Sequence, residues 1–114
     1  MESLEKLKLI YEAALDKKAQ EPSALYVENL ARVADYFLIC TALNPIHARA
    51  IADSVLEKMA EHHENPLRIE GTRGNSWILI DMGEVVAHIM FKEAREYYLL
   101  EKLWGDAPKV ELEI

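Results

Sequence analysis

The side chains best suited to chemistry are four histidines and one cysteine, and their spacing matches no catalytic or metal-binding pattern. His47, His62, His63 and His88 include no pair four residues apart on one helix, and no cysteine pair accompanies them. We therefore expect neither a metal site nor a cofactor. Cys40 lies in an apolar run, which indicates a buried small side chain rather than a nucleophile. Two interpretations of His88 stay open: a hydrogen-bonded core or interface side chain, which is favoured, and a general base.

The glycines form no nucleotide-binding motif. Gly71, Gly74, Gly83 and Gly105 match neither a phosphate-binding loop nor a dinucleotide fingerprint. The segment 71–74 could cradle an anion, but between two strands such a sequence is more often a hairpin loop. We therefore interpret this segment as a loop.

Composition predicts one folded domain with an acidic surface. The chain has 114 residues, of which 51% are hydrophobic and 29% charged, and this length is too short for two separate cores. Its net charge of −7 would repel nucleic acid and attract a basic partner. The single cysteine needs no oxidising compartment, no apolar run reaches membrane length, and the first residues lack the pattern of a secretory signal. We therefore expect a cytoplasmic protein that binds no membrane and has no direct nucleic-acid specificity.

Hydrophobic periodicity predicts a single layered α/β domain in which helices flank a mixed sheet. The expected helices cover residues 3–19, a segment that starts at Asn44-Pro45 and is closed by residues 61–66, and residues 92–104. The expected strands cover residues 24–28, 36–41, 67–70, 76–82 and 84–90. The second strand is nearly all apolar, which indicates a central position, and Gly83 is expected in a hairpin turn. The order is therefore α-β-β-α-β-β-β-α, with residues 1–108 as the domain and 109–114 as a flexible tail.

The last predicted helix has more apolar surface than one core-facing stripe requires. Its large apolar side chains point in several directions and are Tyr97, Tyr98, Leu99, Leu100, Leu103 and Trp104. Either part of this surface faces a partner, or the helix is wedged between the sheet and another part of the chain. Alternation places Trp77, Leu79 and Asp81 on the sheet face opposite Ile78 and Ile80. Large aromatic residues beside charges are typical of interface hot spots, which favours a partner.

Several runs of this sequence resemble the ribosomal silencing factor family, also called Iojap-related. The similar runs are residues 34–41, 50–53, Gly71 with 77–88, and 93–107, so the resemblance extends from about residue 4 to 108. The final Leu-Trp-Gly-Asp-Ala, residues 103–107, is the most specific. Two departures concern Leu99, where the family usually has a polar residue, and Ala42, where glycine is common. Leu99 could make the rim of a contact less polar or strengthen a homodimer.

The resemblance implies a fold related to nucleotidyltransferases and a role in translation. It implies that the protein binds the large ribosomal subunit through its fourteenth protein (uL14), a basic and β-rich component. By occupying that site it would block subunit joining and repress translation when nutrients are scarce. The residues that the resemblance assigns to the contact are Trp77, Tyr98, Glu101 and Trp104, supported by the polar residues Asp81, Glu84, His88 and Arg95. Family members often occur as dimers, so a homodimer is also expected.

Two alternative functions stay open beside this one. The first is a non-catalytic homodimerisation module of another complex. The second is a nucleotidyltransferase-like enzyme, which would need a Gly-Ser pair after an early strand and carboxylates that hold magnesium ions. The chain has Thr41-Ala42 at that place, and the alternate acids Glu111 and Glu113 lie in the predicted tail. We therefore predict that the protein is not an enzyme.

Overall fold

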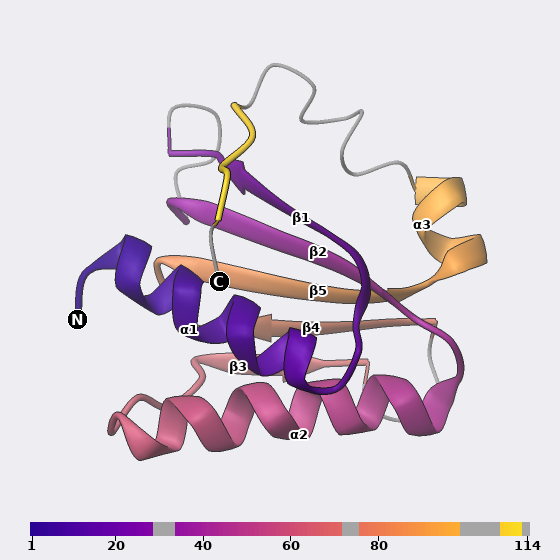
Figure 1. Ribbon diagram of the computed structural model, residues 1–114, viewed down its shortest axis with the longest axis horizontal. Helices are drawn as coiled ribbons and strands as arrows, with labels where there is room; N and C mark the ends of the chain where they lie inside the picture. The colour runs from indigo at the N-terminus through magenta and orange to yellow at the C-terminus, as the bar shows by residue number, and fades with distance from the viewer. Residues whose placement is uncertain (29–33, 72–75, 99–107, 113–114) are drawn as a thin grey trace.

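The computed structural model describes residues 1–28, 34–71, 76–98 and 108–112, and in this part of the chain one mixed sheet carries helices on both of its faces (Figure 1). The elements are α1 (Ser3–Asp16), β1 (Gln20–Tyr26), β2 (Tyr36–Ala42), α2 (Pro45–Glu61), β3 (Arg68–Glu70), β4 (Trp77–Asp81), β5 (Val85–Phe91) and α3 (Lys92–Tyr98). The predicted α/β class and element order are confirmed. None of the described helices is long and apolar enough to cross a membrane.

The strand order of the sheet is β1-β2-β5-β4-β3. Strands β2 and β5 pair in parallel, whereas β1–β2, β4–β5 and β3–β4 are antiparallel. The most apolar strands therefore lie inside the sheet, as the composition of β2 predicts. The β4–β5 hairpin turns at Gly83, whose φ of 91° lies in the left-handed region that glycine adopts without strain.

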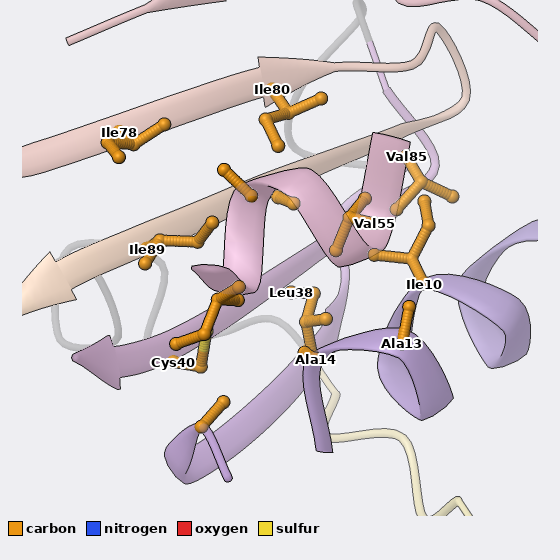
Figure 2. Close-up of a cluster of buried hydrophobic side chains, with 14 of the residues drawn as sticks. Ile10, Ala13, Ala14, Leu38, Cys40, Val55, Ile78, Ile80, Val85 and Ile89 are labelled. Carbon is orange, nitrogen blue, oxygen red and sulfur yellow. The ribbon is translucent and has the colours of Figure 1, made fainter. Parts of the chain in front are cut away.

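The main core lies between the sheet and the layer formed by α1 and α2 (Figure 2). Helix α2 contributes a stripe of five buried residues at helical spacing, Ala48, Ile51, Ala52, Val55 and Met59. Its start is as predicted: the Asn44 side chain accepts a hydrogen bond from the backbone N–H of His47 at 2.8 Å, and proline occupies the first turn. Every second residue of β2 and β5 points into this core, because side chains alternate along a strand.

A smaller cluster lies on the opposite face of the sheet. Its buried members come from β1, β2, β5, α3 and the segments next to the strands: Leu25, Val27, Ala34, Phe37, Ile39, Val86, Met90 and Ala94. Trp77 and Leu79 of β4 pack against it and are only partly buried. Helix α3 leaves the end of β5 and contacts β5 and β2 (Figure 1). The two faces therefore differ, since α1 and α2 cover only one of them.

The end of α1 and the start of β1 differ from the sequence prediction by several residues, whereas β2, β3, β4 and β5 differ by one residue at one or both ends. Helix α1 ends at Asp16, three residues early, where Lys17, Lys18 and Ala19 donate backbone hydrogen bonds to carbonyls of the last turn. Strand β1 begins at Gln20, four residues early, because a register shift between Gln20 and Ser23 lets the strand continue past a proline that has no N–H to donate.

The segment predicted as a flexible tail is attached to the sheet in its described part. Lys109 pairs with Leu25 of β1, and the Val110 backbone N–H donates to the Ala24 carbonyl oxygen at 2.8 Å. Val110 and Leu112 also pack against the main core. The structure differs from the prediction here because β1 is an edge strand, whose free backbone groups can pair with another segment.

Candidate protein-docking site

Among the aromatic residues of the predicted contact surface, Trp77 is the one whose side chain the structure describes. It opens β4 and lies on the face away from α1 and α2, as alternation predicts, while Ile78 and Ile80 are buried in the main core. Its indole Nε1–H donates a hydrogen bond to Nδ1 of His88 at 3.0 Å, and the two ring centroids are 5.6 Å apart. The indole is therefore held on the sheet and remains partly exposed.

His88 lies under Trp77 in the middle of β5. It is paired in register with Ile39 on one side and Leu79 on the other, and only 5% of its surface is exposed. The Phe37 ring meets the imidazole edge-on at a centroid distance of 4.9 Å. Burial lowers the pKa of His88 to about 4, so the ring is neutral at physiological pH. These contacts agree with the interpretation of His88 as a hydrogen-bonded core or interface side chain.

The two acidic residues predicted as supporting positions, Asp81 and Glu84, lie at the other end of the β4–β5 hairpin. Asp81 is paired with Val86, four positions along β4 from Trp77, which separates them by roughly 13 Å. Its carboxylate accepts a hydrogen bond from the Gly83 backbone N–H at 2.9 Å and so closes the turn. Glu84 binds Lys6, whose Nζ is 3.2 Å from its carboxylate. Both acids therefore have structural partners within the chain.

Lys6 makes buried polar contacts that the sequence pattern did not predict. Its side chain is only 5% exposed, and Nζ donates to the Met82 carbonyl oxygen at 2.9 Å and lies 3.5 Å from the Glu64 carboxylate. Partial burial raises the pKa of Glu84, but its own backbone N–H and the Lys6 ammonium outweigh this and hold that pKa below its ordinary value. Lys6 thus ties α1 to the hairpin and to the end of α2. The sequence did contain a signal for this burial, because Lys6 falls on the core-facing side of the first helix, beside Leu7 and Ile10.

Arg95 lies at the same end of the sheet as Trp77 but turns toward β1 and β2. Its Nη1 donates to the Glu21 carbonyl oxygen at 2.6 Å and to Oγ1 of Thr41 at 3.0 Å. The structure therefore brings Trp77 and the start of α3 to one end of the sheet, with His88 beneath Trp77, and leaves Asp81 and Glu84 at the other end. The side chain of Tyr98, and all of Glu101 and Trp104, lie outside the described residues.

An enzyme or a metal site would need a cavity, a set of metal ligands or a reactive cysteine among the described residues. A hollow of about 390 Å³ lies where β1 begins and where β2 and β5 end, and its lining includes Thr41, Ala42 and Phe91. No group of three metal-ligating side chains occurs among the described residues. Burial raises the pKa of the Cys40 thiol to about 12, so this cysteine is not a nucleophile at neutral pH.

The fold and these contacts define a small α/β domain that carries a hydrogen-bonded, partly exposed tryptophan on one face of its sheet. The chain belongs to the ribosomal silencing factor family: the family model described as "RsfS: Ribosomal silencing factor during starvation" matches residues 1–114. The ribosomal silencing factor of Halalkalibacterium halodurans is 43% identical over 113 residues, which are 99% of this chain and 97% of the relative. The family resemblance is therefore confirmed.

Two further comparisons concern the fold and a more distant relative. A crystal structure of a protein from Chromobacterium violaceum superposes with a TM-score of 0.90 at 32% identity and covers all of this chain and 94% of that one. A mouse protein named "Mitochondrial assembly of ribosomal large subunit protein 1" is 35% identical over 92 residues, covering 77% of this chain and 40% of its own length. The family is one of non-catalytic, ribosome-binding translation regulators, which confirms the prediction that the protein is not an enzyme.

Proposed function

We propose that this protein binds the large ribosomal subunit through its fourteenth protein (uL14) and represses translation when nutrients are scarce. The observation that carries the proposal is Trp77, an aromatic residue that is hydrogen-bonded in place yet partly exposed on the sheet face away from α1 and α2. Aromatic residues held in this way are typical of interface hot spots. The net charge of −7 suits a basic partner. A protein that acts on ribosomes is expected in the cytoplasm.

The contact surface that we propose combines the start of β4 with α3 and the residues after it. Its proposed members are Trp77, Tyr98, Glu101 and Trp104, supported by the polar residues Asp81, Glu84, His88 and Arg95. The internal partners of Asp81 and Glu84 favour a supporting role for these two acids. The homodimer stays a separate prediction, which sedimentation velocity of the free protein tests.

The mechanism that we propose is steric. The described domain has extents of 33 × 32 × 26 Å, so a copy docked on the intersubunit face would hold the two subunits apart. Inhibition should then be stoichiometric and reversible, and excess free partner protein should relieve it. Light scattering of subunit joining measures this directly. Inhibition that grows with time at a substoichiometric dose would mean catalysis and would contradict the steric mechanism.

The decisive experiment is cosedimentation with separated ribosomal subunits. We expect the protein to pellet with the large subunit, and Trp77→Ala to weaken binding by about 2 kcal/mol, or roughly 30-fold. The matched control is Ile46→Ala, because Ile46 is 83% exposed and lies on α2, on the other side of the sheet. This variant should bind the large subunit as the wild type does. Equal pelleting with both subunits, or equal effects of the two variants, would refute the proposal.

A further inference from the structure

The hydrogen bond between Trp77 and His88 fixes which nitrogen of the imidazole carries the proton. An indole nitrogen can only donate, so Nδ1 of His88 must accept and carries no proton. The proton of the neutral ring is therefore on Nε2. This Nε2–H is buried and has no hydrogen-bond partner among the described residues. A buried donor without an acceptor destabilises the folded state, so its presence needs a reason.

The surroundings of Trp77 supply that reason. On this face of the sheet its neighbours Met90, directly opposite in register, and Leu79, two residues along β4, have side chains without a nitrogen or oxygen atom. His88 is thus the side chain that accepts the indole N–H, and Phe37 packs edge-on against the imidazole and limits its rotation. An apolar residue at position 88 would avoid the unpaired donor but would leave the indole without this hydrogen bond.

We propose that His88 is a positioning residue of the docking surface, whose Nδ1 holds the Trp77 indole in the orientation that the partner meets. An anchor that is already oriented loses less conformational freedom on binding than one that rotates freely. Histidine at this position therefore gives up some stability in the free protein and strengthens the complex. This inference rests on the proposed function, because it concerns the affinity for the large subunit.

Two substitutions separate the acceptor from the rest of the side chain. His88→Phe keeps a ring but removes both nitrogens, whereas His88→Asn keeps an oxygen at the position of Nδ1. In ¹⁵N NMR spectra the Trp77 indole resonance is assigned by its loss in Trp77→Phe, since the chain has two tryptophans. We expect hydrogen exchange of this indole proton to be at least tenfold faster in His88→Phe than in the wild type and to stay slow in His88→Asn. His88→Phe should unfold at a urea concentration equal to or above that of the wild type.

Binding to purified large subunits tests the functional half of the proposal. We expect His88→Phe to weaken binding about tenfold and His88→Asn to restore most of the affinity. The same His88→Phe change in a Trp77→Phe background should have little effect, because that protein has no indole N–H to hold. An equal loss in both backgrounds would overturn the positioning role and indicate that His88 acts through packing or touches the partner itself.

The remaining outcomes separate this proposal from the proposed function. A Trp77 indole proton that exchanges at the rate of a free indole in the wild type would overturn the positioning role without any variant. Normal large-subunit binding by His88→Phe would overturn it too, and His88→Leu makes the same comparison if His88→Phe does not fold. If the wild-type protein fails to bind large subunits while its indole proton is protected, the proposed function fails and the docking role of His88 fails with it.

Discussion

The free energy of unfolding should fall between pH 7 and pH 5 because His88 is buried. In the folded protein burial lowers the pKa of His88 to about 4, from an ordinary value of 6.5 in the unfolded chain. Between these two values the unfolded state binds the proton more readily than the folded state. The contribution of His88 is thus fully present above pH 6.5, decreases as the pH falls, and is gone below pH 4.

The size of this effect follows from the two pKa values. A difference of one pKa unit corresponds to about 1.4 kcal/mol, so the full contribution is about 3 kcal/mol. Part of the transition lies below pH 5, and we therefore expect a loss of about 2 kcal/mol between pH 7 and pH 5. Urea denaturation followed by circular dichroism at several pH values in this interval measures the loss. The lower limit of pH 5 avoids Glu84, whose pKa lies below its ordinary value of 4.5.

The matched control is His88→Phe, measured at the same pH values. The remaining histidines, His47, His62 and His63, are common to both proteins, so their contributions cancel in the comparison. We expect the variant to lose about 2 kcal/mol less than the wild type over this interval. If the two proteins lose stability in parallel, then burial does not disfavour the charged form of His88 and the reasoning is refuted.

Two further predictions concern stability at neutral pH, both measured by urea denaturation. Gly71→Ala should destabilise the protein by about 3 kcal/mol or more, because the residue has a φ of 85° and a Cβ would lie 1.9 Å from the Trp77 carbonyl oxygen. Gly83→Ala, with a similar φ of 91° but its nearest neighbour at 3.8 Å, should cost only about 1 kcal/mol, and equal losses would contradict the steric argument. Lys6→Met should cost about 1–3 kcal/mol by removing the partner of Glu84, and a double variant with Glu84→Gln should recover part of this loss. Unchanged stability of the single variant would mean that the buried ammonium contributes nothing.

Local patterns made much of the fold predictable from the sequence. The α2 stripe, the Asn44 cap, the apolar β2 strand and the turn at Gly83 each depend on residues within a few positions of one another. The attachment of residues 109–112 was not predictable in this way, since it depends on β1 being the edge of the sheet. The contact of Lys6 with Glu84 likewise joins residues 78 positions apart. Long-range pairings of this kind follow from the topology, which the sequence pattern does not specify.

The candidate site was predictable in outline but not in its internal contacts. Alternation correctly placed Trp77 on the face opposite Ile78 and Ile80. The hydrogen bond from Trp77 to His88 required the register of the hairpin, in which Leu79 faces His88 and Trp77 lies two residues further along. The turn at Gly83 fixes that register, so the pair could have been found by counting outward from the turn.

The alternation of β5 lets one strand contribute both to stability and to the proposed docking surface. Ala87 and Ile89 point into the main core beneath α1 and α2, whereas His88 between them points to the opposite face and holds Trp77. Because side chains on the two faces of a sheet do not touch, an unfavourable polar group on one face leaves the packing of the other intact. The buried Nε2–H of His88 lies on the face of the smaller apolar cluster. The larger cluster, which is the main core, therefore keeps its packing, and the fold tolerates this donor. Substitutions at Trp77 and His88 should consequently change binding without loss of the fold, whereas truncation of Ile89 should reduce stability first.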